Sequence, residues 1–439
     1  MNYLPDGKFL DIIISVAIDH FKLYNNLPVI FVDMPEVPSA AIGFMVKIGQ
    51  RDGGLAKAEI SHVLEHLLFD GTKKLPKRTD IALAIDEIGA EFSGETGEEH
   101  TYYYLKSEPK NFQKAAFILS QMVVYPLLKD SELQKEKQII LQELDLREDE
   151  PIVKITDFLQ ETLFPNHPLG CSREAGKKAL PKMTRSDLLN HYQKNYLTGS
   201  AVLVVCGDKK KLGNLRKMEE EYFGELKKGE REPLEKVAKE TKGTIRVINK
   251  RTNQTHFAMG IRTFPLTDKR IYSGKILDII FGHSFSSRLF QQIREKRKLA
   301  YAVFSSIDFF QDTGVFSLYE GVDQKRLEEA IKATREEMEK ITINKAQGIT
   351  EKELKRAKNY LSGRIAVQMD DPANQVVFYA KHFLFHKEII EPQELIKRHE
   401  AVKKGELVEI AKDLFKPEKI NLVAMGKGID KGKLEKIIE

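Results

Sequence analysis

The chain has 439 residues, of which 41% are hydrophobic and 31% are charged, with a formal net charge of +5 at pH 7. Such a composition excludes a disordered chain and is typical of a globular protein with two or more domains. The mild charge gives no indication of nucleic-acid binding, and no run of about 18 apolar residues indicates a membrane span. Because the cysteines, Cys171 and Cys206, lie far apart and suggest no disulfide framework, we expect a cytoplasmic protein.

The first predicted elements lead directly to a candidate site. The apolar run FLDIIISVAI at 9–18 contains Asp11 and has no cleavage pattern after it, which favours a strand over a signal peptide. Residues 40–52 then predict a strand and residues 58–69 a helix. This helix would place His62, Glu65 and His66 on one face.

These three residues have the order HxxEH, which is typical of inverzincins. Two imidazoles one helical turn apart can occupy two corners of a zinc tetrahedron, and a nearby carboxylate that is not a ligand can deprotonate water. The motif therefore predicts that His62 and His66 bind metal and that Glu65 is the general base. The alternative is a surface helix with polar residues on its wet face.

The rest of the chain contains two similar series of patterns. In the first half, the strand at 40–52 and the helix at 58–69 are followed by a long predicted helix at 131–151 and a closing strand at 200–208. The second half repeats this order, with a strand at 255–269, a helix at 271–282, a long helix at 350–372 and a closing strand at 419–428. Between them, residues 224–244 are charged, contain Gly and Pro, and predict a linker. We therefore expect an α/β (α+β) protein with two duplicated domains, residues 1–223 and 245–439.

The duplication is unequal in its chemistry. At the place of the histidine motif the second half reads IIFGHSFSSRLF, with one histidine and no glutamate. Alignment of the acidic-Pro turns after the two long helices places Arg364 opposite Glu143. Only the first half can therefore build the site.

Several further phrases make the chain resemble the M16 metallopeptidases, the family of pitrilysin, insulysin and the mitochondrial processing peptidases. The resemblance covers nearly the whole chain and rests on SHVLEHLLFDGT, LFDGTKKLPKR, FPNHPLG, HYQKNYLTGSAVLVVCGD and SSRLFQQIREKRKLAYAVFSS, in that order. It implies two domains, each a mixed, largely antiparallel sheet covered by helices. It also implies peptide hydrolysis with one Zn²⁺ per chain, a third ligand at Glu143, 77 residues after His66, and an outer supporting carboxylate at Glu136. For Glu136, an exposed helix carboxylate is the alternative.

The resemblance also implies substrate-binding residues in both halves. An edge strand that pairs with an extended peptide would carry Ser93, Gly94 and Glu95, where the family usually has Asn-Ala. Arg294 and Tyr301 match the family residues that reach the substrate carbonyl and the tetrahedral intermediate. An ion-paired arginine and a core tyrosine are the alternative for this pair.

Short members of the family supply two domains per chain and pair to enclose a chamber. The resemblance therefore implies a homodimer, with a heterodimer containing a related zinc-less subunit as the alternative. We expect a peptide or an unfolded protein as the substrate, and neither nucleic acid nor membrane as a partner. A non-catalytic structural subunit and a peptide-binding subunit are the alternatives to an endopeptidase.

Overall fold

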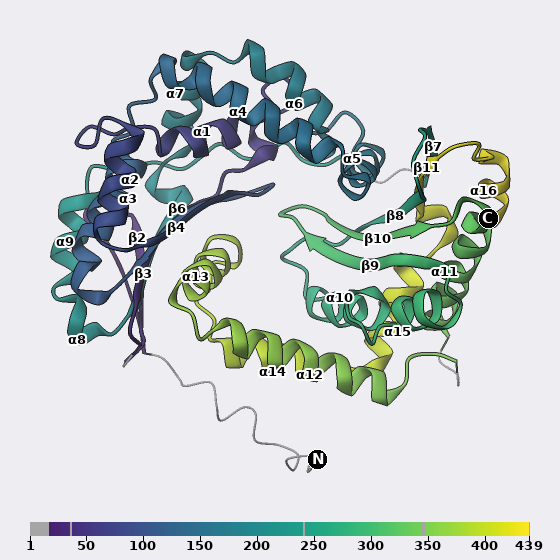
Figure 1. Ribbon diagram of the computed structural model, residues 1–439. Coiled ribbons are helices and arrows are strands. Elements are labelled where there is room, and N and C mark those ends of the chain that lie inside the picture. The colour runs from purple at the N-terminus through teal and green to yellow at the C-terminus, as the bar shows by residue number, and fades with distance from the viewer. Residues whose placement is uncertain (1–16, 36, 240–241, 344–346, 439) are drawn as a thin grey trace. The chain divides into compact units, whose positions relative to one another are not determined.

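The computed structural model describes residues 17–35, 37–239, 242–343 and 347–438 (Figure 1). Most of the strand expected at 9–18 therefore lies outside the described residues. The chain forms two compact units, each built from three segments. The first unit contains Met1–Leu144, Glu174–Leu234 and Ile365–Glu394, and the second contains Asp145–Arg173, Glu235–Arg364 and Leu395–Glu439.

The first unit is built on a mixed six-stranded sheet with the order β1-β2-β6-β3-β5-β4. Only the pair β2 and β6 is parallel, and the other neighbours are antiparallel. The central strands β3 and β6 are buried along their whole length, which explains their nearly continuous apolar sequences. The strands are β1 (Ile18–Lys22), β2 (Pro28–Asp33), β3 (Ala40–Val46), β4 (Glu91–Thr96), β5 (Thr101–Ser107) and β6 (Ala201–Gly207).

Helices cover both faces of this first sheet. One core joins one face of the sheet to α1 (Ile60–Leu68), α2 (Arg78–Glu87) and α3 (Phe112–Val124). A separate core joins the opposite face to α13 (Pro372–His386). The other helices that lie wholly or partly in this unit are α4 (Asp130–Glu148), α6 (Arg173–Ala179), α7 (Arg185–Asn195), α8 (Lys209–Leu212), α9 (Leu215–Phe223), α12 (Glu351–Gln368) and α14 (Pro392–Glu400).

The second unit is built on a mixed five-stranded sheet with the order β7-β11-β8-β10-β9, in which only β7 and β11 are parallel. Helix α5 (Pro151–Leu163) packs on β8 and β11. The strands are β7 (Ile245–Asn249), β8 (Thr255–Thr263), β9 (Ala300–Phe309), β10 (Gly314–Val322) and β11 (Asn421–Gly426). The other α-helices that lie wholly in this unit are α10 (Ile271–Asp278), α11 (Leu327–Thr342), α15 (Lys404–Leu414) and α16 (Lys431–Ile438), and the unit also contains two π-helices, Ile279–His283 and Phe290–Lys296.

The two units exchange one helix each. Helix α5 comes from the first half of the chain but packs in the second unit, whereas α13 comes from the second half and packs in the first. Both helices begin with a proline at their first position, where the missing N–H costs no hydrogen bond. Two of the five unit boundaries fall within α4 and α12, the long helices that directly precede α5 and α13.

The duplicated order of elements is confirmed by these two mixed sheets with helical cover. Residues 227–239 and 242–244, in the predicted linker, have no regular secondary structure. The predicted domains, with boundaries at 223 and 245, are two continuous stretches of the chain. The compact units differ from them, because the segments of the two units alternate along the chain. Within the described part of the chain, no helix combines the length and the hydropathy that a membrane span requires.

Candidate metal centre

The histidine motif lies on α1, whose other face is buried in the first unit. Ile60, Val63, Leu64, Leu67 and Leu68 are each at most 1% exposed, so the helix has one fixed orientation. The Ser61 hydroxyl donates a hydrogen bond of 2.6 Å to the Gly49 carbonyl and fixes the start of the helix. The half-buried face that remains carries the two histidines and Glu65.

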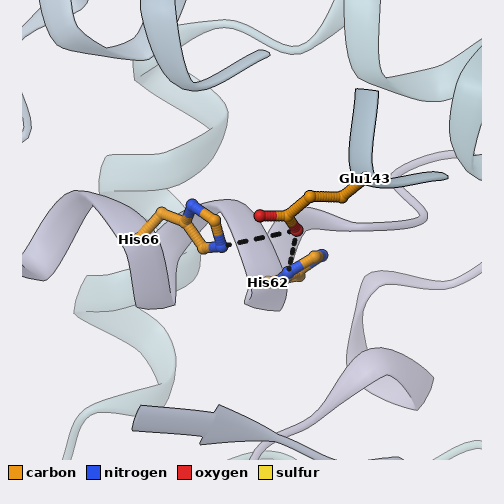
Figure 2. A group of neighbouring side chains, drawn as sticks. All are labelled: His62, His66 and Glu143. Atoms are coloured by element: carbon orange, nitrogen blue, oxygen red, sulfur yellow. Dashed lines mark ion pairs between the residues drawn. The ribbon is translucent and has the colours of Figure 1, made fainter. Parts of the chain in front are cut away.

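Helix α4 brings Glu143 to these histidines (Figure 2). One oxygen of the Glu143 carboxylate lies 3.6 Å from Nε2 of His62 and 3.9 Å from Nε2 of His66. Ligand atoms from all three residues lie within 4.8 Å of one another. Among the described residues this is the one His, Cys, Asp and Glu group with such geometry.

The donor set fits Zn²⁺. Two imidazole nitrogens and one carboxylate oxygen are the protein ligands of many catalytic zinc sites. Ligand atoms about 2.1 Å from a tetrahedral ion are about 3.4 Å apart, close to the separations between Glu143 and the two Nε2 atoms. These separations are also longer than ordinary hydrogen bonds, so the three side chains surround a space without closing it.

Each histidine is oriented by a further carboxylate at its other ring nitrogen. Nδ1 of His66 lies 2.7 Å from Glu136, and Nδ1 of His62 lies 2.9 Å from Glu59. An ionised carboxylate can only accept a hydrogen bond, so Nδ1 of each ring carries a proton, and in the neutral imidazole the lone pair is then on Nε2, which lies near Glu143. This is the tautomer that a metal ligand requires.

Glu136 is buried, at 2% exposure, and is therefore not the exposed carboxylate of the alternative interpretation. Arg78 also donates a hydrogen bond of 2.8 Å to it. Burial works against the charged form, but the hydrogen bond and the charge of His66, together with Arg78, lower the pKa of Glu136. Burial likewise opposes the charged form of His66, but the hydrogen bond and charge of Glu136, together with the charges of Glu143 and Glu65, raise the pKa of that imidazole. The carboxylate therefore stays ionised beside the histidine.

Glu65 is held by the neighbouring edge strand. Thr96, the last residue of β4, donates a hydrogen bond of 2.7 Å to Oε2 of Glu65. A side-chain carbon added to Gly94 would lie 3.0 Å from Oε1 of Glu65, so the strand backbone runs directly against the carboxylate. Glu65 and His66 also line a pocket of about 360 Å³, whose apolar walls include Phe69, Ile85 and Phe92.

Ser93, Gly94 and Glu95, which the resemblance assigns to an edge strand, lie on β4. Strand β4 ends the sheet order, and among the described residues it pairs with β5 alone. Ser93 and Gly94 line the pocket beside Glu65, whereas Glu95 accepts a hydrogen bond of 2.7 Å from Tyr102. Their contact with substrate stays a prediction.

Arg294 and Tyr301 lie together in the second unit. The Arg294 guanidinium carbon is 5.2 Å from the centre of the Tyr301 ring, and both residues line a hollow of about 440 Å³. Tyr301 is 75% exposed, which excludes the core tyrosine of the alternative interpretation. Lys298, which lies between Arg294 and Tyr301, has a φ of +50°, in the left-handed region that favours glycine. The substrate-binding role of the pair stays a prediction.

Sequence reasoning missed three residues of the site. Glu59 bonds His62, Thr96 bonds Glu65, and Arg78 bonds Glu136. Glu59 lies three residues before His62 but outside the helix, with a left-handed backbone, so helical spacing does not identify it. The other two contacts join separate elements and have no local signature.

Comparisons with known proteins agree with the geometry. Residues 28–176 match the protein family described as "Insulinase (Peptidase family M16)", and residues 182–361 match the family described as "Peptidase M16 inactive domain". An uncharacterized zinc protease of Rickettsia felis is 32% identical over 397 residues, which cover 90% of this chain and 94% of that protein. The uncharacterized zinc protease YmxG of Bacillus subtilis is 30% identical over 382 residues, with 85% and 90% covered.

The fold is also that of solved structures. The crystal structure of a protease from Helicobacter pylori has a TM-score of 0.84 at 21% identity, covering 94% of this chain and 99% of that one. A structure titled as a peptidase M16 inactive domain, from Pseudomonas fluorescens, has a TM-score of 0.86 at 19% identity and the same coverage. With the full-length relatives and the two matched regions, the comparisons show that this chain belongs to peptidase family M16.

Proposed function

We propose that the protein is a zinc endopeptidase that hydrolyses peptide bonds in extended peptides or precursor proteins. The observation that carries this proposal is the grouping of His62, His66 and Glu143 next to Glu65. The curated relatives named zinc proteases support it. One Zn²⁺ per chain is expected because the described residues contain one such group.

The roles of the residues follow from their atoms. His62 and His66 would hold the metal through Nε2, and Glu143 through a carboxylate oxygen. When bound, Zn²⁺ lowers the pKa of water and polarises a carbonyl oxygen. Glu65 would accept a proton from the attacking water and deliver it to the leaving amine nitrogen. Thr96 keeps the Glu65 carboxylate in place for both transfers.

Substrate would bind as an added strand along β4, through main-chain hydrogen bonds. The pocket lined by Phe69, Ile85 and Phe92 would then accept one apolar side chain next to the scissile bond. In the second unit, the Arg294 guanidinium and the Tyr301 hydroxyl would donate hydrogen bonds to a substrate carbonyl and to the oxyanion that develops from it.

Cleavage of a quenched fluorescent peptide tests the function. We expect about one zinc per purified chain, loss of cleavage with a chelator, and recovery when zinc is added back. Glu65→Gln should keep its zinc and lose about 100-fold or more in kcat, because it removes the proton acceptor. Glu87→Gln, an exposed carboxylate on α2, is the matched control and should cleave normally. Wild-type rates in Glu65→Gln would contradict the assignment, and zinc binding without cleavage would favour a peptide-binding subunit.

We further propose that the working form is a cytoplasmic homodimer. The support is the resemblance to members in which two-domain chains pair around a chamber, and the presence of both the histidine motif and the Arg294 and Tyr301 pair in one chain. Light scattering on the purified chain should give twice the monomer mass. A fully active monomer would contradict the pairing, and activity that appears only with a second, related subunit would favour the heterodimer.

A further inference from the structure

Glu59 has a backbone conformation that calls for an explanation. It precedes α1 with a φ of +72° and a ψ of 0°, in the left-handed region that favours glycine. Its side chain does not cap the helix that it begins. A strained residue of this kind persists where its surroundings hold it, and it is most often found at functional sites.

The Glu59 side chain is directed into the metal centre. It is 9% exposed, and Oε2 lies 2.9 Å from Nδ1 of His62. The same oxygen accepts a hydrogen bond of 3.1 Å from the side-chain amide of Gln50. Burial of a carboxylate is costly unless it is hydrogen-bonded, and both of these donors bind Oε2.

Gly176 of α6 makes room for this carboxylate. A side-chain carbon added at residue 176 would lie 2.8 Å from Oε1 and 2.9 Å from Cγ of Glu59. Contacts below 3.0 Å force a shift, so any larger residue would displace Glu59. Three separate segments, around Gln50, Glu59 and Gly176, therefore position one carboxylate behind His62.

We propose that Glu59 is a positioning residue of the metal centre, which orients His62 and strengthens it as a zinc ligand. Glu59 accepts a hydrogen bond from the Nδ1–H group of His62. This hydrogen bond orients the imidazole with Nε2 towards Glu143 and increases the basicity of Nε2. It does for His62 what Glu136 does for His66. Glu136 is shared with Arg78, whereas within the described residues His62 is the only ionisable partner of Glu59. This inference rests on the proposed zinc site.

Zinc affinity of the metal-free protein, measured by competition with a chromophoric chelator, tests the proposal. Glu59→Gly should weaken zinc binding by about 10-fold to 100-fold. Glycine suits the left-handed backbone, so the thermal midpoint of the metal-free variant should not fall. Glu59→Gln keeps an acceptor oxygen for Nδ1 and should lose less affinity than Glu59→Gly. Lys387→Gly, at an exposed position with a φ of +58°, is the matched control and should bind zinc as the wild type does.

Gly176→Ala supplies an independent arm. It should weaken zinc binding in the wild-type background but have no further effect in Glu59→Gly, because the displaced carboxylate is then absent. The absorption spectrum of bound Co²⁺ should change in the same variants, since it reports the ligand geometry. Wild-type affinity in Glu59→Gly would overturn the inference and leave the proposed function intact. A wild-type chain that binds no zinc would overturn both.

Discussion

At the scale of single residues, the position of Glu65 depends on one hydrogen bond from Thr96. Thr96→Val removes the hydroxyl but keeps the shape of the side chain, so the carboxylate loses its fixed orientation. A hydrogen bond to a charged group contributes about 1.5 to 3 kcal/mol. We therefore expect kcat for peptide cleavage to fall by about 10-fold to 100-fold, with zinc content and the thermal midpoint nearly unchanged.

Thr96→Ser is the matched control for this change. It restores the hydroxyl without the methyl group and should recover most of the wild-type rate. A Thr96→Val protein with normal kcat would show that Glu65 is positioned by other contacts. Loss of bound zinc in the same variant would instead show that Thr96 acts on the ligands.

A second residue-scale prediction concerns a buried acid in the second unit. Glu320 on β10 is fully buried, and burial raises the pKa of its carboxyl to about 8 in spite of a hydrogen bond from Thr334. In the unfolded chain the same group loses its proton near its ordinary value of 4.5. Between these two pH values the unfolded state releases a proton that the folded state keeps, so Glu320 lowers stability as pH rises, by about 1.4 kcal/mol per pH unit.

Glu320→Gln removes this titration while keeping an acceptor for Thr334. We expect the variant and the wild type to have similar thermal midpoints at pH 5, and the variant to be more stable by a few kcal/mol at pH 8 and above. Glu351→Gln, at an exposed position on α12, should show no such pH-dependent difference. Equal midpoints for Glu320→Gln and wild type from pH 5 to pH 9 would exclude a buried neutral acid.

The residues of the site differ in how far the sequence determines them. His62 and His66 could be identified because helical spacing alone places them on one face. No local rule connects them to Glu143, 77 residues later, so that ligand could be named only through the family resemblance. Glu59 and Thr96 could not be assigned roles, because their contacts depend on a left-handed backbone and on a neighbouring strand.

At the scale of elements, the packing of α13 depends on a glycine. A side-chain carbon added to Gly43 of β3 would lie 2.3 Å from Cγ1 of Val376 on α13. Val376 is buried and branched at Cβ, so it has little freedom to move aside. We expect Gly43→Ala to displace α13 and to destabilise the first unit by about 1 to 3 kcal/mol.

Hydrogen exchange and thermal unfolding would measure this effect. Faster exchange should be confined mainly to Pro372–His386 and to the strands that this helix covers. Gly405→Ala is the matched control, because the added carbon at this exposed position of α15 meets no atom within 4 Å. It should leave stability unchanged or raise it by up to about 1 kcal/mol. Unchanged exchange at α13 in Gly43→Ala would contradict the close packing.

Periodicity explains both what could and what could not be predicted about these elements. Strand β3 follows from a short, nearly continuous apolar run, and helix α1 follows from apolar residues with a period of about 3.6. The structure has both elements at the expected places. A pattern shows that a helix has an apolar face but does not specify which sheet that face covers. The exchange of α5 and α13 between the two units could therefore not be predicted from the sequence.

At the scale of the whole molecule, the exchange makes each unit depend on both halves of the chain. Without α13, the apolar face formed by residues such as Ile30, Met45 and Val204 would be exposed to water. Without α5, the same would hold for Ala258 and Val423 of the second sheet. A fragment of residues 1–234 lacks α13, and a fragment of residues 235–439 lacks α5. We therefore expect neither fragment to fold alone.

Co-expression of the two fragments supplies each sheet with its missing helix. Each fragment alone should be insoluble, or should bind a hydrophobic dye and unfold without cooperativity, because large exposed apolar faces promote aggregation. Together they should form a soluble one-to-one complex that unfolds cooperatively and binds zinc. Gly43→Ala in the first fragment should weaken that association, since it obstructs α13. A 1–234 fragment that is soluble, monomeric and cooperatively folded would show that α13 is a peripheral addition to the first unit and not part of its core.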